Sequence, residues 1–224
     1  MLELTYFPVY AKGLQLACIL EASGLAWTGV TTTKDGLAVL KEKGDTPFGQ
    51  LPILKCGEGL VVGQSVAIAN YVGRLGKTDG ASDADFARSQ MCLAEGEDLY
   101  ALLISHELAR WKPADIRNAK RAAQETLFSE TAPKHLALLE GLIQGEAFTS
   151  TGQSTGELYL FGMLLQLTGA CNESTMLAPF PKLQAWFNKT SQLPAVLKVL
   201  SGASAIGKLG PYFLNDKDYA AFNQ

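Results

Sequence analysis

Residues 48–75 read FGQLPILKCGEGLVVGQSVAIANYVGRL, and this stretch decides the fold that the sequence predicts. Proline cannot donate a hydrogen bond to a central ladder, so a strand that starts here should hold Pro52 at its first residue or lie at the edge of the sheet. The apolar residues after it predict two short strands joined by the turn at residues 57–59. Gln64 and Ser65 then open an amphipathic helix, for which the Ser65 hydroxyl is a candidate N-cap.

The two ends of this stretch offer binding groups for a peptide-like ligand. A cis bond between Leu51 and Pro52 would turn the backbone N–H and C=O of Leu51 outward, towards such a ligand. The unpaired N–H groups at the start of the helix near Ser65 would attract a carboxylate. The stretch thus carries candidate contacts for both the backbone and a carboxylate of the ligand.

The spacing of these elements resembles the N-terminal domain of the glutathione transferases, in which a Gln-Leu-Pro turn precedes a Gln-Ser helix start by a dozen residues. The resemblance implies that the backbone of Leu51, in the turn with Gln50 and Pro52, pairs with the cysteinyl part of glutathione. It also implies that Gln64 and Ser65 hold the γ-glutamyl end.

The chain start predicts a strand over residues 2–6 and a helix over residues 12–22. Tyr6-Phe7-Pro8 resembles the tyrosine-type classes (pi, mu, alpha and sigma), whose first strand closes with tyrosine, an aromatic residue and proline. The resemblance implies that Tyr6 is catalytic and donates its hydroxyl to the glutathione thiolate; the alternative is an aromatic residue of the core. Lowering a thiol pKa by about two units takes roughly 2.7 kcal/mol, and a hydrogen bond to a charged group supplies roughly 1.5–3 kcal/mol.

The sequence departs from the tyrosine-type pattern just after this strand. Those classes carry Arg-Gly-Arg where this chain reads Tyr10-Ala11-Lys12, so the arginine beside the catalytic tyrosine is missing. Lys12 is a candidate for the lost positive charge, although lysine lacks the planar fork of arginine. Tyr10 is a candidate second hydroxyl for the sulfur. We expect this change to affect the catalytic rate more than glutathione binding.

A second departure concerns the glycyl carboxylate of glutathione. Leu37 stands where several relatives place a tryptophan that meets this carboxylate. Lys43, seven residues before Gln50, matches the lysine that those classes use for the same group. Lys41 is the alternative for this contact. For both lysines, the simplest interpretation is a solvated surface charge that binds no ligand.

Composition and charge exclude several classes of protein. The chain has 224 residues, of which 47% are hydrophobic and 18% charged, as in an ordinary globular protein of one or two domains. A net charge of −3 without a long basic run argues against nucleic acid as a partner. No apolar run reaches the roughly 18 residues needed to cross a bilayer, and the N-terminus shows no secretory signal.

The cysteines indicate a reducing compartment. Cys18, Cys56, Cys92 and Cys171 lie far apart without Cys-x-x-Cys spacing, which argues against a zinc site or a redox dithiol. Cysteine-type relatives place a catalytic thiol at the start of the first helix, whereas Cys18 comes in mid-helix and is expected to be a packed thiol. These observations favour a cytoplasmic protein.

The second half of the chain changes character after residues 79–83, which read DGASD and indicate a linker. We expect a glutathione-binding domain over residues 1–78 and a helical domain with the acceptor site over residues 84–224. The helical period predicts a long helix over residues 84–110 and a second over residues 115–143 that Pro133 interrupts. Further on, Ser154 and Glu157 predict a capping box, a folding element rather than a catalytic one.

Two residues point to a homodimer. Phe48 stands where pi, mu and alpha relatives carry an aromatic key that enters the helical domain of the partner, and an exposed aromatic side chain seeks burial. Burial in its own core is the alternative. Asp98 matches an aspartate that reaches across the dimer to the γ-glutamyl ammonium, although Glu95 and Glu97 flank it and a solvated acidic face is the alternative.

The acceptor site for the electrophile is implied by the same resemblance. It lies between the first strand–helix loop, the end of the long helix and the C-terminal tail, with His106 as a possible polar contact. The residues expected there are apolar or aromatic: Val9, Tyr10, Leu103, Ile104, Leu108, Tyr212 and Phe213. The tail over residues 202–224 is too aromatic for a disordered segment, and we expect it to cover the site.

The sequence thus predicts the glutathione transferase fold: a thioredoxin-like α/β domain followed by an all-helical (all-α) domain. The resemblance covers essentially the whole chain. It implies a cytoplasmic homodimer that conjugates glutathione, its co-substrate, to hydrophobic electrophiles in detoxification, without a metal, nucleic acid or membrane partner. Two alternatives on the same scaffold stay open: a non-catalytic structural or ligand-carrying protein, and a sigma-like glutathione-dependent prostaglandin isomerase.

Overall fold

The computed structural model describes residues 1–172 and 175–223; residues 173, 174 and 224, which fall in the expected helical domain and tail, lie outside the described residues. The chain opens with a four-stranded sheet in the order β2-β1-β3-β4. β1 runs parallel to β2 and antiparallel to β3, which pairs antiparallel with β4. The strands are β1 (Leu2–Tyr6), β2 (Trp27–Thr31), β3 (Ile53–Lys55) and β4 (Val61–Gly63).

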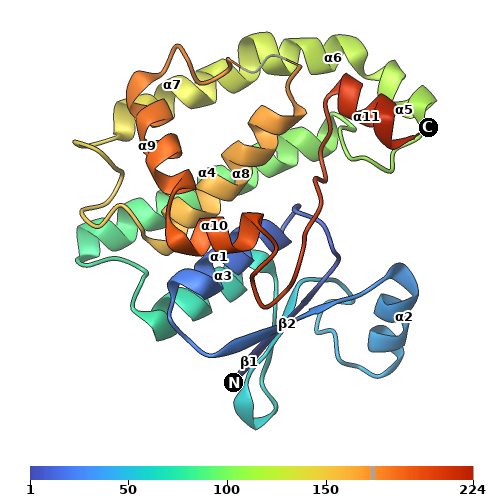
Figure 1. Cartoon of the computed structure of the whole chain (residues 1–224), viewed down its shortest axis with the longest axis vertical. Coiled ribbons are helices and arrows are strands. Elements are labelled where there is room, and N and C mark those ends of the chain that lie inside the picture. Colours follow the sequence, from blue (N-terminus) through green and yellow to red (C-terminus); the bar gives the residue numbers. More distant parts are fainter. Residues whose placement is uncertain (173–174, 224) are drawn as a thin grey trace.

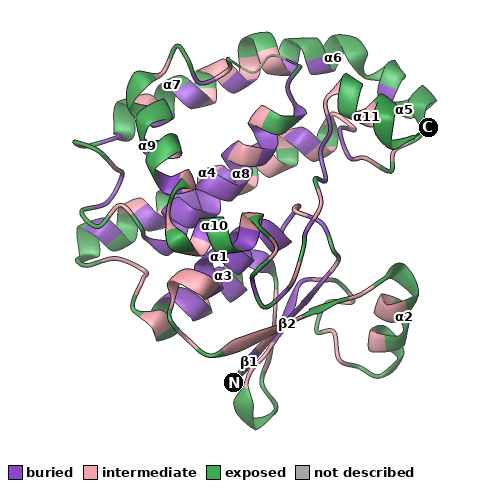
Figure 2. Cartoon of the chain, in the orientation of Figure 1, coloured by how far each residue is buried: buried purple, intermediate pink, exposed green. Residues whose placement is uncertain are grey.

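Three helices accompany this sheet: α1 (Gly13–Ala22), α2 (Lys34–Glu42) and α3 (Ser65–Gly76). α1 and α3 contact each other and also helix α8 of the second half, so they lie between the sheet and the remaining helices (Figure 1). α1 is buried over most of its length, and Cys18 in its middle is fully buried, as expected for a packed thiol. α2 lies at the side of the sheet, and all its residues are at least partly exposed (Figure 2).

The second half is built around α8, which is buried along nearly its whole length and packs against α4 and α1 (Figure 2). Gly156 permits the close approach of α8 to α4, because a Cβ there would overlap the carbonyl oxygen of Ser89. None of the described helices has both the length and the apolar composition needed to cross a bilayer. The helices of this half are α4 (Asp83–Ser105), α5 (Ala114–Ala119), α6 (Arg121–Thr126), α7 (Ala132–Leu142), α8 (Thr155–Ala170), α9 (Pro181–Ser191), α10 (Pro194–Leu200) and α11 (Asp216–Phe222).

The succession of an α/β part and a helical part agrees with the predicted fold class, but two helix predictions need correction. α4 ends at Ser105 instead of residue 110, because Glu107 takes a φ of +57°, which a right-handed helix does not accommodate. The helix expected over residues 115–143 is divided into α5, α6 and α7. A π-helical turn over Leu127–Thr131 separates α6 from α7, and Pro133 stands in the first turn of α7, where proline is tolerated.

The predicted capping box at the start of α8 is confirmed. The Ser154 hydroxyl accepts a hydrogen bond from the N–H of Glu157 at 3.3 Å, and the Glu157 carboxylate accepts one from the N–H of Ser154 at 3.0 Å. The buried carboxylate also accepts the N–H groups of Phe148 and Thr149, at 2.9 and 3.2 Å. Glu157 therefore fixes the preceding loop to the central helix as well as capping it.

Candidate functional site

The sheet register brings the main predicted residues to one edge. Thr5 pairs with Ile53 across β1 and β3, and Ile53 pairs with Gly63 across β3 and β4. The next residues in these ladders are Tyr6, Pro52 and Gln64, so they end neighbouring strands at the same edge of the sheet. Adjacent strands lie about 4.8 Å apart, which places the Tyr6 end of β1, the Leu-Pro turn and the start of α3 around one small region.

Tyr6 is held in a defined orientation at this edge. Its side chain is 5% exposed, and its hydroxyl oxygen accepts a hydrogen bond from the backbone N–H of Lys12 at 3.2 Å. Because the oxygen accepts this bond, the hydroxyl hydrogen stays available for another acceptor. Burial raises the pKa of Tyr6, and the nearby phenol of Tyr100 adds to this effect, so Tyr6 is a neutral donor at physiological pH.

The structure decides the isomer of the turn before β3, which the sequence left open. The peptide bond between Leu51 and Pro52 is cis. Pro52 is buried, Leu51 is half-buried and Gln50 is exposed, so the turn lies at the surface while its proline packs inward.

The start of α3 corrects one prediction, because Ser65 is not the N-cap. Gln64 is the cap residue, with a φ of +70°, and Ser65 is the first residue of the helix and buried. The chain turns into the helix one residue earlier than predicted because Gln64 adopts this positive φ. In the described part of the chain, no side chain caps α3, which leaves its first N–H groups for a ligand.

The loop between α2 and the cis turn is largely solvent-exposed. Lys43 follows the last residue of α2 and is exposed, as is Lys41, while Leu37 is half-buried within the helix. Phe48 is 64% exposed, so the alternative of burial within its own chain is wrong. The structure therefore brings Tyr6, the cis turn and α3 together, and places the lysines on a neighbouring exposed segment.

The ammonium of Lys12 does not contact Tyr6. Its Nζ forms an ion pair with Glu97 of α4, lies 3.7 Å from the centre of the Tyr100 ring and is 3.5 Å from the hydroxyl of Tyr159. The sequence indicates Glu97 only as an acidic neighbour of Asp98, because Lys12 and Glu97 are 85 residues apart and their pairing depends on how α4 packs.

The predicted acceptor residues lie mostly below the surface. Val9, Leu103, Leu108 and Tyr212 are buried, with exposures of 3%, 0%, 1% and 6%, whereas Tyr10 and Ile104 are half-buried. The reason is the tail, which packs over the loop after β1 and the loop after α4, as expected from its aromatic residues. His106 uses its Nδ1 to contact the carbonyl oxygen of Leu102 at 2.7 Å, which is a structural contact.

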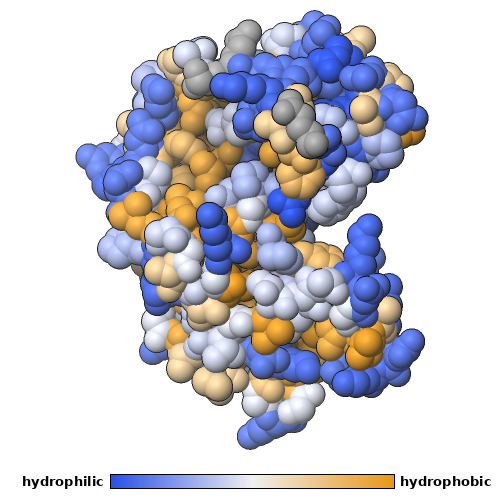
Figure 3. Space-filling view, turned by 45° about the vertical axis from the view of Figure 1, so that its right-hand side comes forward, coloured by the Kyte–Doolittle hydropathy of each residue, from blue (hydrophilic) through white to orange (hydrophobic). Residues whose placement is uncertain are grey.

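Backbone hydrogen bonds tie the tail down. The N–H of Tyr10 donates to Gly210 at 2.8 Å, and the N–H of Arg110 donates to Tyr212 at 2.8 Å. The tail descends from α10 towards the sheet and returns to α11 beside α5 (Figure 1). A hollow in the molecular surface separates the lower, sheet-bearing part from the upper, helical part (Figure 3).

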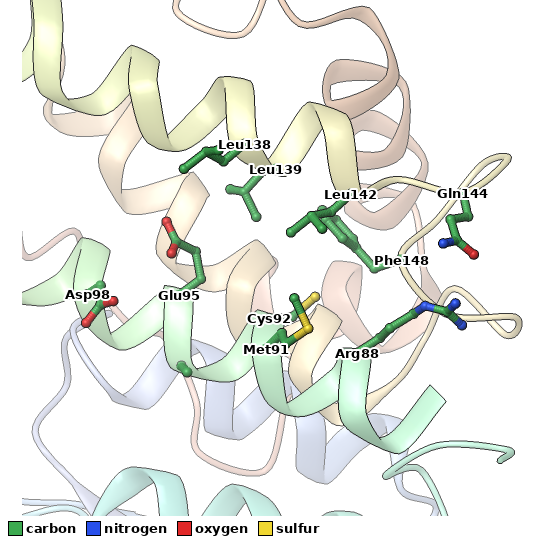
Figure 4. Close-up of a pocket in the computed structure, with 11 residues that line it drawn as sticks. Arg88, Met91, Cys92, Glu95, Asp98, Leu138, Leu139, Leu142, Gln144 and Phe148 are labelled. Atoms are coloured by element: carbon green, nitrogen blue, oxygen red, sulfur yellow. The ribbon is translucent and has the colours of Figure 1, made fainter. Parts of the chain in front are cut away.

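An apolar groove between α4 and α7 was not predicted. It encloses about 360 Å³, and Asp98 and Glu95 lie at one end of it (Figure 4). Leu138 and Met91 beside the groove are 70% and 51% exposed, and large apolar side chains on exposed helix faces indicate an interface. The sequence shows that these residues are apolar but not that they are exposed. The lining residues are Arg88, Met91, Cys92, Ala94, Glu95, Asp98, Leu138, Leu139, Leu142, Gln144 and Phe148.

The chain is similar to known proteins over both parts. Residues 104–201 match the family model described as the C-terminal domain of glutathione S-transferase. Glutathione S-transferase 1 of Ascaris suum is 30% identical over 140 residues, a match that spans 62% of this chain and 65% of that protein. The chain thus covers somewhat less than two thirds of the length of that relative.

Solved structures extend the similarity to nearly the whole chain. The glutathione S-transferase from Ascaris lumbricoides superposes with a TM-score of 0.75 at 25% identity, covering 90% of this chain and 96% of that one. A structure named prostaglandin synthase D, from Nilaparvata lugens, superposes with a TM-score of 0.74 at 22% identity, covering 90% of this chain and 97% of that one. At that lower identity the second similarity shows the fold alone.

These findings agree with the architecture of the chain, in which a thioredoxin-like α/β part precedes an all-helical part. The predicted fold class, the glutathione transferase fold, is confirmed. Residues 104–201 match the C-terminal domain of the glutathione S-transferase family, and the two Ascaris proteins extend the similarity to this family beyond that domain.

Proposed function

We propose that this chain is a glutathione transferase that joins the sulfur of glutathione to hydrophobic electrophiles, with Tyr6 as the catalytic residue. The observation that carries the proposal is the Tyr6 hydroxyl at the sheet edge, oriented by the Lys12 N–H with its own hydrogen available. A neutral phenol in this position stabilises a thiolate by donating to it, and the thiolate is the reactive form of the thiol.

The reaction needs only this activated sulfur and an acceptor. The thiol proton leaves to solvent, and the thiolate then attacks an electron-poor carbon of the acceptor. In a displacement, a carbon–halogen bond breaks and the halide leaves with its electron pair. In a conjugate addition, the carbon–carbon π bond breaks and the neighbouring carbon takes a proton from water.

The remaining contacts of the proposal follow from the groups at the sheet edge. The Leu51 backbone, beside Gln50 and Pro52, pairs with the cysteinyl part of glutathione. Gln64 and the uncapped start of α3 hold the γ-glutamyl carboxylate, because unpaired N–H groups at a helix N-terminus attract anions. Lys43 reaches the glycyl carboxylate, and Asp98 of a partner subunit reaches the γ-glutamyl ammonium.

An affinity and turnover experiment tests the function. The protein is passed over immobilised glutathione, and conjugation of a chloronitrobenzene is followed by absorbance. We expect retention on the column and turnover of the chloronitrobenzene. Retention without turnover on any tested electrophile would support the ligand-carrying alternative, and failure to bind glutathione would refute both.

Ser65→Ala should weaken glutathione binding about 10–100-fold, since a hydrogen bond to a charged group contributes roughly 1.5–3 kcal/mol. The Ser65 hydroxyl stands at the first position of α3, next to the proposed carboxylate site. Titration calorimetry with glutathione gives the Kd directly. Ser201→Ala, at an exposed serine beyond α10, is the matched control and should leave the Kd unchanged. An unchanged Kd in Ser65→Ala would remove this residue from the site.

The proposed dimer rests on two complementary features. Phe48 projects from its loop with 64% exposure, and the groove between α4 and α7 presents exposed apolar side chains. A second copy of the chain would bury both, in a two-fold arrangement that forms the contact twice. Asp98, at the end of the groove, would then lie near the subunit interface, as its proposed contact with the glutathione of the partner requires.

Phe48→Ser should weaken the dimer by about 30-fold or more for each contact, because an aromatic interface anchor contributes roughly 2 kcal/mol or more. Sedimentation equilibrium over a range of concentrations measures this dissociation. Phe222→Ser removes an equally large exposed side chain, 53% exposed on α11, and should not alter the association. A dimer that both variants leave intact would refute the role of Phe48.

A further inference from the structure

A buried polar cluster lies beneath the proposed catalytic tyrosine. The Lys12 side chain is 11% exposed, and its ammonium is enclosed by the Glu97 carboxylate, the face of the Tyr100 ring and the Tyr159 hydroxyl. The Tyr159 hydroxyl donates a hydrogen bond to Glu97, and the Tyr159 side chain is fully buried. These three groups come from α4 and α8, so the ion pair and the hydrogen bond of the ammonium are made to those helices and not to the phenol of Tyr6.

The charge of Lys12 depends on Glu97. Burial lowers the pKa of Lys12, and the charge and hydrogen bond of Glu97 oppose this effect. A buried ammonium without a partner is strongly disfavoured, so loss of the carboxylate would release the lysine side chain from this position. The ion pair thus anchors residue 12 to α4.

The turn that carries Lys12 is anchored at a second point. Ala11 has a φ of +26°, an uncommon conformation for a residue other than glycine. Its carbonyl oxygen accepts a hydrogen bond from Nε2 of Gln166, in α8, at 2.9 Å. With Lys12 held by Glu97, the orientation of the N–H that reaches Tyr6 is fixed from both sides.

We propose that the Lys12–Glu97 ion pair positions the phenol of Tyr6, by fixing the turn so that the Lys12 N–H, and not the Lys12 ammonium, meets the Tyr6 oxygen. Lys12 and Glu97 are thus positioning residues, and the inference rests on the proposed role of Tyr6. The tyrosine-type relatives place an arginine cation beside the tyrosine. In this chain the backbone N–H of Lys12 takes that position, and the buried Lys12–Glu97 ion pair fixes its direction.

The other polar groups that face Tyr6 are two neutral phenols, and the Lys12 N–H is the group that donates a hydrogen bond to its oxygen. Tyr100 of α4 and Tyr212 of the tail face it, and burial raises the pKa of both phenols, that of Tyr100 to about 12. Both are therefore neutral in the range where a thiol ionises. The Lys12 N–H is the contact that lowers the pKa of Tyr6 against the effect of burial.

The test compares variants by the apparent pKa of the bound glutathione thiol, read from the ultraviolet absorbance of the thiolate against pH. Lys12→Met keeps the N–H and most of the side-chain length but removes the charge. We expect the apparent thiol pKa to rise by about 0.5–1 unit, which lowers the ratio of thiolate to thiol about 3–10-fold at any given pH. Lys12→Arg, which can still pair with Glu97, should restore the wild-type value.

The double variant Lys12→Met/Glu97→Leu separates positioning from plain stability. An apolar pair often replaces a buried ion pair without loss of stability, so its melting temperature should recover while the thiol pKa stays raised. If the apolar pair restores the pKa as well, the ion pair serves packing alone and the proposal fails. Lys189→Met, which breaks the exposed ion pair with Glu146, is the control and should change neither quantity.

Glu97→Gln and Tyr6→Phe separate failure of the positioning role from failure of the proposed function. Glu97→Gln, which keeps the lysine, should also raise the thiol pKa; a lowered value would mean that the freed ammonium stabilises the thiolate and would overturn the proposal. A pKa that rises in Tyr6→Phe but not in Lys12→Met refutes the positioning role alone. A pKa that Tyr6→Phe leaves unchanged refutes the proposed function itself.

Discussion

Tyr6→Phe is expected to lower kcat/KM for conjugation about 10–100-fold at pH 6.5, the largest effect on the reaction rate among the predictions. The phenylalanine ring fills the same buried space but cannot donate to the sulfur, so the thiolate loses a hydrogen bond of roughly 1.5–3 kcal/mol. The apparent thiol pKa should rise by about one to two units for the same reason. Initial rates measured from pH 5.5 to 9.5 provide both values.

The dependence of the conjugation rate on pH tests whether Tyr6 is the donor to the sulfur. Because the phenol of Tyr6 is neutral and its pKa lies above its ordinary value, the rate of the wild-type enzyme should follow thiol ionisation and level off once the thiolate has formed. The Tyr6→Phe rate should keep rising with pH and approach the wild-type rate at alkaline pH. A variant with wild-type activity across the range would exclude Tyr6 as the donor.

Tyr10→Phe distinguishes the two phenols near the site. Tyr10 is half-buried in the loop after β1, and its backbone N–H is bonded to the tail. We expect this variant to keep the wild-type thiol pKa, because the oriented hydroxyl is that of Tyr6. A raised pKa in Tyr10→Phe and not in Tyr6→Phe would transfer the catalytic role to Tyr10.

Glu157→Ala is expected to lower the free energy of unfolding by about 3–5 kcal/mol, the largest effect on stability among the predictions. Its carboxylate accepts the N–H groups of Phe148, Thr149 and Ser154 in a fully buried position. Removing it leaves these donors unsatisfied, at roughly 1–3 kcal/mol each, with some relaxation of the loop. Urea unfolding followed by circular dichroism measures the change.

Two other substitutions bracket this effect. Glu157→Gln keeps one acceptor oxygen and should lie between the wild type and Glu157→Ala. Glu146→Ala, at an exposed glutamate paired with Lys189, should leave the unfolding midpoint unchanged. A midpoint for Glu157→Ala equal to that of Glu146→Ala would show that the capping box does not anchor the loop.

The elements that the sequence predicted correctly depend on neighbours in the chain. The strand that ends at Tyr6, the turn that leads into β3 and the capping box at Ser154 each rest on a few adjacent residues with a strong local preference. The errors come from the same source. Ser65 has the right side chain for an N-cap, but the unusual backbone of Gln64 moves the helix start, and residue type alone does not reveal that φ.

The sequence by itself therefore determined the family resemblance, the order of an α/β part and a helical part, and Tyr6 as the candidate donor, because short motifs and periodicity encode them. Only the tertiary structure decided what surrounds that donor. The pairing of Lys12 with Glu97 and the tail over Val9 join residues far apart in the chain, and no spacing rule connects them. Such contacts follow from how the buried helices α1, α4 and α8 pack, which sets the direction of the Lys12 N–H towards Tyr6.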